Sequence, residues 1–267
     1  MGDLALVYMV AGMSSRFLGK IKQFAVIGDN DETLIERSLK QALQAGFTKI
    51  VFIVGKMTEV PFKEKFGNNY QGIPIYYASQ LYNENERERP WGTTDALCSA
   101  KFFLNCPFVV CNGDDLYGEN SFRILTEHLK KNNTCATLGF KLGTVIPEIG
   151  KANRGIFQIE GNCVTGLEEN LGIEKTTLAE NNLTEDSLCS MNIFALHPEV
   201  LTELADILKE FKEKNKDDKR IEALLPNDIS LLIQQGKIIV NIYPATDIWL
   251  GVTNPGDEDV VREKLKN

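Results

Sequence analysis

A compact polar loop at residues 11–23 follows the apolar run at residues 4–10 and holds residue types that bind phosphate. Small residues let backbone N–H groups approach phosphate oxygens, and cationic side chains supply charge. The loop contains both kinds, namely Gly12, Ser14, Ser15, Arg16 and Lys22. Because ligands bind at the carboxyl ends of strands in open α/β sheets, this position predicts a phosphate site. Taken alone, the same residues would also suit a surface loop with two solvated cations.

Two adjacent carboxylates, Asp114 and Asp115, follow a second apolar run at residues 108–111. A buried strand over that run would place both side chains at its carboxyl end. Mg²⁺ commonly binds one or two carboxylates together with substrate phosphates. The pair therefore predicts a magnesium site, with a cap for a helix that begins near Glu119 as the alternative.

Four segments of the chain match, in the same order, the motifs of one known family. They are the loop with Gly12, Arg16, Lys22 and Gln23, and the segments at residues 90–97, 109–118 and 249–257. Over nearly its whole length the chain resembles the nucleotidyltransferases of the sugar-1-phosphate nucleotidylyltransferase type. It is most similar to a branch with a Lys-Gln signature loop and a Gly-Val-Thr late motif.

The resemblance implies an enzyme that joins a nucleoside triphosphate (NTP) to a phosphorylated small molecule, with Mg²⁺ as cofactor. Arg16 and Lys22 would be catalytic on the pyrophosphate side, where a planar guanidinium and a mobile ammonium can follow the moving charge. The implied nucleotide-binding residues are Ala11, Gly12, Met13, Ser14, Ser15, Gln80, Gly92 and Thr93. From the residues alone, Gln80 could equally face solvent, and Thr93 could cap a helix.

The implied acceptor-binding residues are Asn112, Arg154, Gly155, Glu168 and Glu169. In this interpretation Arg154 meets the acceptor phosphate and the carboxylates accept hydrogen bonds from hydroxyl groups. The chain departs from the family at Asn170, where relatives carry a second catalytic lysine. We expect Lys175, five residues further on, to replace it.

The resemblance makes Asp114 a metal ligand and leaves the second ligand open. Many relatives supply an aspartate where this chain has Gly251. We expect an oxygen of Thr253 to take that place. The alternatives are Asn254, Asp247 and Asp257.

The hydrophobic pattern predicts an α/β fold with a central, mostly parallel or mixed sheet. Apolar runs at residues 4–10, 49–54, 73–77 and 108–111 alternate with helical stretches, which is typical of a parallel sheet covered on both faces. Short strands are expected at residues 134–141, 155–159, 163–167 and 188–195, with a hairpin turn at Gly161. This pattern favours one Rossmann-like (GT-A-like) domain over residues 1–267, with a small antiparallel extension. The resemblance implies that residues 1–132 bind the nucleotide and residues 133–267 the acceptor.

Composition narrows the partners and the compartment. The net charge of −8 without a basic cluster argues against nucleic acid as a partner. No segment reaches the apolar length of a membrane span, and the six cysteines form no C-x-x-C pair. We expect a cytoplasmic protein that works on an NTP and a phosphorylated small molecule and that is compatible with a homo-oligomer.

Two other functions fit part of the sequence. A GT-A-like glycosyltransferase would share the nucleotide-binding half and the acidic pair, but it would not need Arg16 and Lys22 for a triphosphate. A catalytically silent nucleotide-sensing protein is favoured by Asn170 and Gly251. Release of pyrophosphate from an NTP and a sugar phosphate distinguishes the enzyme from both.

Overall fold

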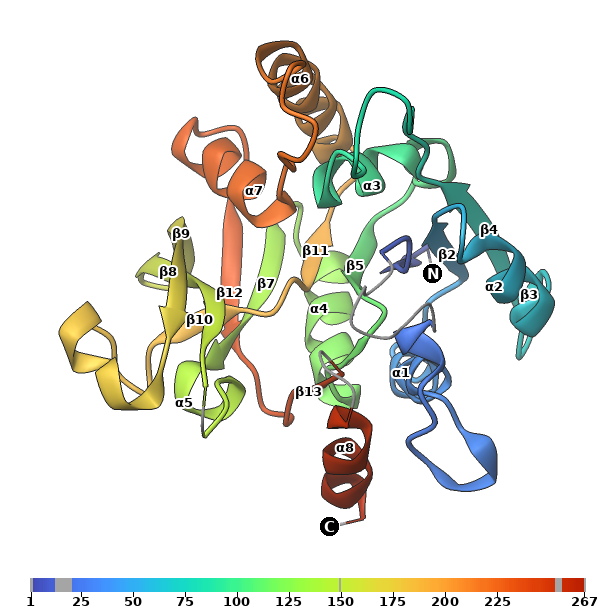
Figure 1. The fold of residues 1–267 in the computed structure, drawn as a ribbon, viewed down its shortest axis with the longest axis horizontal. Helices are drawn as coiled ribbons and strands as arrows, with labels where there is room; N and C mark the ends of the chain where they lie inside the picture. The colour runs from blue at the N-terminus through green and yellow to red at the C-terminus, as the bar shows by residue number, and fades with distance from the viewer. Residues whose placement is uncertain (1, 13–20, 149, 253–255, 267) are drawn as a thin grey trace.

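In the computed structural model, which describes residues 2–12, 21–148, 150–252 and 256–266, eleven strands form one mixed sheet with helices on both faces (Figure 1). The strands of this sheet are β1 (Ala5–Met9), β2 (Lys49–Val54), β3 (Asn69–Tyr70), β4 (Ile73–Ser79), β5 (Phe108–Asn112), β7 (Cys135–Lys141), β8 (Ala152–Glu160), β9 (Cys163–Ile173), β10 (Leu188–Ser190), β11 (Phe194–Leu196) and β12 (Val240–Pro244). A separate pair joins β6 (Asp115–Leu116) to β13 (Leu250–Gly251).

The first half of the sheet is parallel and buried on both faces. Strands β5, β1, β2 and β4 lie side by side in that order. The continuous apolar sequence of β2 is typical of a strand that helices cover on both sides. The register aligns Met9, at the end of β1, with Asn112, at the end of β5. The segments that follow these two strands therefore begin next to each other.

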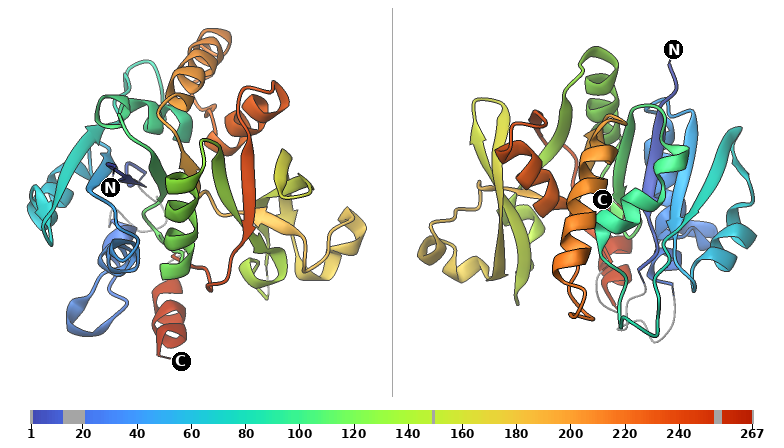
Figure 2. Two further views of the ribbon diagram at one scale, coloured as in Figure 1. Left: turned by 180° about the vertical axis from the view of Figure 1, so that it is seen from behind. Right: turned by 90° about the horizontal axis from the view of Figure 1, so that it is seen from above.

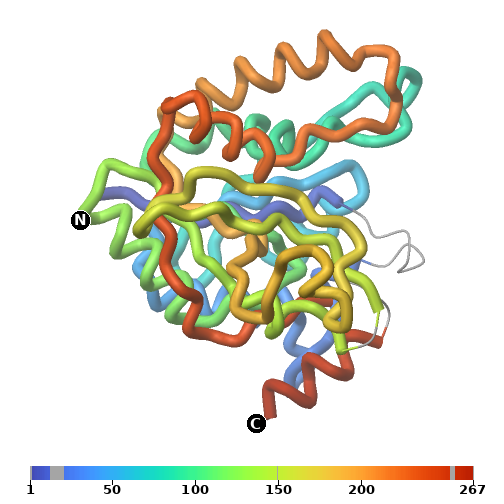
Figure 3. Tube along the Cα trace, turned by 90° about the vertical axis from the view of Figure 1, so that its left-hand side faces the viewer, coloured from blue at the N-terminus to red at the C-terminus, as the bar shows by residue number. Residues whose placement is uncertain are grey.

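Helices cover the two faces of the sheet as separate groups (Figures 2 and 3). Helices α1, α2 and α4 pack on one face through a cluster that includes Leu39 and Phe62. Helices α3, α6 and α7 pack on the other face through a cluster that includes Leu97 and Leu204. The α-helices are α1 (Leu34–Leu43), α2 (Glu59–Phe66), α3 (Thr93–Ser99), α4 (Glu119–Lys131), α5 (Leu142–Val145), α6 (Val200–Lys214), α7 (Leu225–Gln234) and α8 (Asp257–Leu265), and the 3-10 helices are η2 (Lys22–Phe24), η3 (Asp29–Asp31), η4 (Lys101–Phe103), η5 (Lys175–Thr177) and η6 (Ala179–Asn181).

In the second half of the sheet, strand pairings close a ring. β7 pairs with β12, β12 with β9, β9 with β8, β8 with β10, and β10 again with β7. Apolar side chains fill the space along these strands, and Gly139 makes room for them. A Cβ on Gly139 would lie 2.9 Å from Leu188 Cδ1 and 3.0 Å from Ile242 Cδ1. β11 connects this ring to the parallel half by pairing with both β7 and β5.

The predicted α/β fold with a smaller antiparallel extension is confirmed, and the hairpin at Gly161 joins β8 to β9. Two details differ from the sequence prediction. The strand expected at residues 188–195 is interrupted between β10 and β11, where Asn192 has a φ of 56° that a strand cannot continue through. β9 extends to Ile173, beyond the expected strand end at residue 167, so Glu168, Glu169 and Asn170 also lie on the strand.

No helix in the described part of the chain is long and apolar enough to cross a membrane. All six cysteines are free thiols.

Candidate active site

Lys22 and Asp114 meet at the carboxyl edge of the parallel strands. Lys22 begins η2, Asp114 follows β5, and Lys22 Nζ forms an ion pair with Asp114 Oδ2. Gly113 keeps the two segments close, because its N–H donates to the Met9 carbonyl at 3.2 Å and a Cβ on it would collide with Val10. The fold thus brings the predicted phosphate-binding cation to the predicted metal ligand.

The described start of the polar loop runs close past the end of β2. A Cβ on Gly55 would lie 2.7 Å from the carbonyl oxygen of Ala11, so the glycine leaves room for the loop. Gly12 is exposed. The other predicted residues of this loop, Met13, Ser14, Ser15 and Arg16, lie outside the described residues, as does Thr253.

Asp115 is buried directly behind Asp114, with a side chain that other residues hold in place. The residue is only 5% exposed. Asn112 Nδ2 donates to Asp115 Oδ2 at 2.9 Å, and the Tyr117 hydroxyl lies 3.2 Å from the same oxygen. Burial, together with the charge of Asp114, raises the pKa of Asp115 to about 7.

Residues from both halves of the chain line one cavity of about 260 Å³ beside this edge. Six predicted site residues line it: Thr93, Asn112, Asp114, Arg154, Gly155 and Glu169. Asp115 and Trp249 contribute further walls. A cavity that joins two adjacent carboxylates to a cation and a third carboxylate offers donors and acceptors to a small polar molecule.

Arg154 is held in a fixed position in the wall of this cavity. Its Nη2 donates to the Val145 carbonyl at 2.7 Å, and its guanidinium lies 5.5 Å from the centre of the Trp249 ring. Arg154 Nε and Trp249 Nε1 are buried N–H groups without a hydrogen-bond partner among the described residues. Burial raises the pKa of Glu169, and the nearby Arg154 opposes that shift. The site therefore combines donors that suit phosphate or hydroxyl oxygens with a carboxylate acceptor.

Seven of the predicted site residues that the structure describes do not line this cavity: Ala11, Gly12, Lys22, Gln80, Gly92, Glu168 and Lys175. Glu168 neighbours Glu169 on β9, and successive side chains of a strand point to opposite faces. Lys175, at the start of η5, forms an ion pair with Glu148. Gln80, at the end of β4, is buried and donates from Nε2 to the Gly92 carbonyl at 2.9 Å.

Gly92 has a packing role that the sequence did not indicate. Its φ of 100° is in the left-handed region, and a Cβ there would collide with the backbone of Ala223, whose nitrogen would lie 2.7 Å away. Because Gly92 has no side chain, the backbone at Ala223 can pack against it, although 131 residues separate the two in the sequence.

A family model describes most of this chain. The model for nucleotidyl transferases matches residues 18–243. The chain belongs to the nucleotidyl transferase family. A search of curated proteins finds no match.

Solved structures share the fold of this nucleotidyl transferase over nearly its full length. One is a protein from Bacillus anthracis assigned as a glucose-1-phosphate thymidylyltransferase, in complex with a sucrose, with 14% identity, a TM-score of 0.71, and coverage of 99% of this chain and 96% of the other. Another is a UDP-glucose pyrophosphorylase complexed with UDP-glucose, with 15% identity, a TM-score of 0.68, and coverage of 100% and 99%. A third is a UTP-bound UGPase from Acinetobacter baumannii, with 16% identity, a TM-score of 0.66, and coverage of 99% and 93%. At these identities the likeness establishes the fold.

The donor set of this nucleotidyl transferase fits a magnesium ion that also binds substrate. The described residues contain no group of three or more histidine, cysteine, aspartate or glutamate side chains that could hold a metal by themselves. Asp114 and Asp115 are the two carboxylates at the strand end, and Mg²⁺ takes its other ligands from phosphates and water in such sites.

Gly251 cannot be replaced by the aspartate of other family members without local rearrangement. It pairs with Asp115 in the small sheet of β6 and β13. A Cβ on Gly251 would lie 2.6 Å from Asp115 Oδ1 and 2.7 Å from Trp249 Cη2. The space for a side chain at this position is already filled.

Asp247, one alternative for the second metal ligand, caps a helix. Its Oδ2 accepts a hydrogen bond from the Ser121 backbone N–H at 3.0 Å, and its Oδ1 accepts one from Asn120 Nδ2 at 2.9 Å. Both donors lie in the first turn of α4. This contact explains an aspartate at this position without a metal.

Sequence reasoning missed several residues that line the cavity, including Asn153, Ser190 and Asn192. Ser190 and Asn192 lie at the break between β10 and β11, which the sequence pattern predicted as one strand. Asn192 was the sequence signal for this break, because asparagine adopts the left-handed backbone region more readily than most residues.

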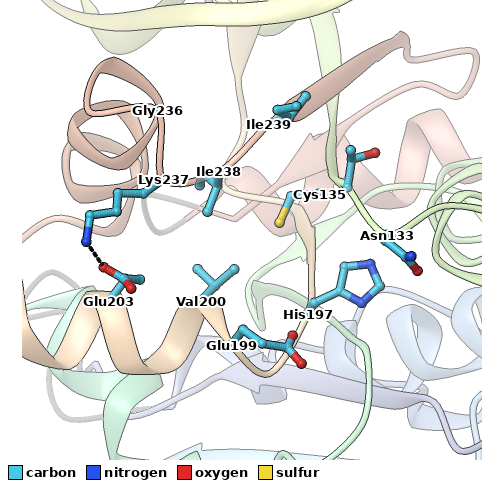
Figure 4. Close-up of a pocket in the computed structure, with 11 residues that line it drawn as sticks. Asn133, Cys135, His197, Glu199, Val200, Glu203, Gly236, Lys237, Ile238 and Ile239 are labelled. Carbon is cyan, nitrogen blue, oxygen red and sulfur yellow. Dashed lines mark hydrogen bonds and ion pairs between the residues drawn. The ribbon is translucent and has the colours of Figure 1, made fainter.

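A second cavity, of about 520 Å³, lies away from this site at the first residues of β7 and the start of α6 (Figure 4). Cys135, His197 and Ile239 line it, and Lys237 forms an ion pair with Glu203 at 2.7 Å. None of the predicted site residues borders it.

We predict that Asp247→Ala lowers the free energy of unfolding by about 1 kcal/mol, because α4 loses its cap. Mn²⁺ affinity, measured by electron paramagnetic resonance, should stay unchanged, as it should for Asp217→Ala at an exposed position. Loss of Mn²⁺ binding with unchanged stability would make Asp247 a metal ligand instead.

Gly251→Ala should destabilise the protein by about 1–3 kcal/mol, because the added methyl group overpacks the contact between Asp115 and the Trp249 ring. Urea unfolding measures this difference, with Gly2→Ala as the control, since a Cβ on Gly2 meets no atom within 4 Å. Equal stability of both variants would show that the space at Gly251 is open.

Proposed function

We propose that this protein transfers a nucleotidyl group from an NTP to a phosphorylated small molecule, most simply a sugar 1-phosphate, in a Mg²⁺-dependent reaction that releases pyrophosphate. One observation carries the proposal. A single cavity contains Asn112 and Asp114 from the strand end next to the Lys22 loop, and Arg154 and Glu169 from the second half of the chain. The two substrates of a nucleotidyl transfer must meet in this way.

On the nucleotide side, Lys22 and Arg16 stabilise the leaving pyrophosphate, and the loop at Ala11 to Ser15 binds the phosphates. The ion pair of Lys22 with Asp114 supports this assignment, because the same ammonium group can bind a phosphate oxygen that shares the metal. Gln80, Gly92 and Thr93 bind the base and ribose. The UTP-bound neighbour supports a nucleotide as substrate.

Asp114 is the proposed Mg²⁺ ligand, with an oxygen of Thr253 as the second protein ligand. A bound Mg²⁺ would neutralise charge on the phosphate oxygens. The chain's own contribution is to fix the carboxylate. Asp114 lies just beyond Gly113, which follows β5, and the end of β5 is held against β1, so the sheet sets its position.

On the acceptor side, Arg154 binds the acceptor phosphate, while Glu169, Glu168 and Gly155 contact its hydroxyl groups. The unpartnered N–H of Arg154 and the carboxylate of Glu169, which lines the cavity, support this division. The neighbour complexed with UDP-glucose supports a sugar. Asn112 contacts the acceptor from the strand end.

Lys175 is proposed to supply the second catalytic cation that Asn170 cannot provide. In the structure its ammonium is paired with Glu148, whose side chain is 83% exposed. An exposed ion pair is worth little, so a phosphate can compete for the lysine. The proposed setting is a cytoplasmic, single-domain protein whose partners are the two small substrates, without nucleic acid or membrane, and compatible with a homo-oligomer.

We predict that Asp114→Asn lowers the rate of pyrophosphate release on the order of 10²–10³-fold, as for loss of a group that stabilises transition-state charge. Mn²⁺ binding in the presence of an NTP should weaken in parallel, while the melting temperature changes little because the side chain lies at the surface of the cavity. Asp186→Asn, at an exposed aspartate, is the control. Near wild-type turnover in Asp114→Asn would refute the metal assignment.

Glu169→Gln and Glu168→Gln form a matched pair on one strand. We expect Glu169→Gln to raise KM for the acceptor by about tenfold, because a carboxylate that accepts hydrogen bonds is lost from the cavity. The effect of Glu168→Gln should be smaller, since that side chain does not line it. KM for the NTP should stay constant in both. The reverse order in the steady-state kinetics would exchange the two roles.

A further inference from the structure

The side chain of Gln80 has a fixed hydrogen-bonding direction. Gln80 is 6% exposed, and its Nε2 donates to the Gly92 carbonyl and to Asp95 Oδ2, both at 2.9 Å. A carbonyl and a carboxylate only accept hydrogen bonds, so the amide cannot be rotated by 180° without losing both contacts. Both amide hydrogens are used. The carbonyl oxygen, Oε1, is the atom that remains to meet another molecule.

An ion pair with Lys212 holds the carboxylate that fixes Gln80. Asp95 lies in the first turn of α3 and is 8% exposed. Its other oxygen, Oδ1, accepts from Lys212 Nζ at 2.5 Å. Lys212 belongs to the last turn of α6, and its ammonium lies 5.7 Å from the centre of the Trp91 ring. A lysine from the second half of the chain therefore orients a glutamine of the first half.

The segment around Gly92 is tied to the same region by further contacts. Arg87 stacks on Trp91, with its guanidinium carbon 3.3 Å from the ring centre. It also donates to the backbone carbonyls of Asp218, at 2.7 Å, and Ile221, at 2.6 Å. α3 and α6 lie next to each other in Figure 1. The network around Gln80 is thus built into the packing of these two helices.

We propose that Asp95 and Lys212 are positioning residues that hold Gln80 as a hydrogen-bond acceptor, and that this selects nucleobases with a ring N–H. This inference rests on the proposed function, in which Gln80 faces the base. Uracil and guanine carry an N–H at the ring position where cytosine and adenine carry a lone pair. The fixed carbonyl oxygen of Gln80 accepts a hydrogen bond from a ring N–H. It repels the lone pair of an unprotonated ring nitrogen. A site that admits pyrimidines therefore binds UTP more tightly than CTP. A site that admits purines binds GTP more tightly than ATP.

A purely structural network predicts a different result. If Asp95 and Lys212 only joined α3 to α6, their loss would lower stability and weaken all nucleotides alike. A positioning role changes the ratio between two nucleotides of equal size. The ratio of dissociation constants is therefore the quantity to measure.

The test is isothermal titration of the full chain with UTP, CTP, GTP and ATP in the presence of MgCl₂. The wild type should bind UTP at least about tenfold more tightly than CTP, or GTP at least about tenfold more tightly than ATP. In Asp95→Asn the amide can offer a donor or an acceptor, so Gln80 can turn and the ratio should fall to about threefold or less. Lys212→Met should lower the ratio in the same direction, Lys212→Arg should keep it, and Lys209→Met, on the exposed side of α6, is the control. Melting temperatures identify any variant that is unfolded.

A wild type that binds the four nucleotides without preference, or prefers CTP or ATP within its pair, overturns the inference and leaves the proposed function intact. The same holds for a ratio that is unchanged in folded Asp95→Asn. If the wild type binds neither these four nor dTTP with Mg²⁺, the proposed function itself fails, and the inference fails with it.

Discussion

The parallel pairing of β1 with β5 is the constraint on which the candidate site depends. It sets Met9 opposite Asn112 and so starts two functional segments at the same edge of the sheet. The register fixes the side-chain positions, because a shift of the pairing by one residue would move the side chains of a strand to the other face of the sheet. Lys22 and Asp114 form an ion pair at this edge. The nucleotide and metal assignments both rely on it.

The second half of the chain completes the cavity through the ring of strands around β7. β8 and β9 pair so that Gly155 lies opposite Glu169, which puts the proposed acceptor residues on neighbouring strands. Arg154 is fixed by backbone carbonyls and by the Trp249 ring, and no carboxylate of the described residues forms an ion pair with it. A guanidinium whose charge is not already paired is available to an anionic ligand. The proposed acceptor side therefore offers the Arg154 guanidinium to an anionic ligand.

The sequence allowed the parallel half of the sheet to be predicted because its strands are continuous apolar runs, such as β2. The family motifs predicted that Asp114 and Lys22 belong to one site, and the two residues form an ion pair. Contacts between distant segments could not be predicted. The fit of Ala223 against Gly92 and the ion pair of Lys175 with Glu148 depend on the tertiary structure and leave no local pattern. The break at Asn192 was missed because the apolar pattern continues across it.

The central claim is that two substrates meet in one cavity, and pyrophosphate release tests it most directly. The measurement uses the wild-type protein with Mg²⁺, a set of NTPs and a set of sugar 1-phosphates, and omits each component in turn. The account predicts pyrophosphate and an NDP-sugar only in the complete mixture. Pyrophosphate without an acceptor, or no pyrophosphate from any combination while an NDP-sugar is consumed as a donor, would contradict it.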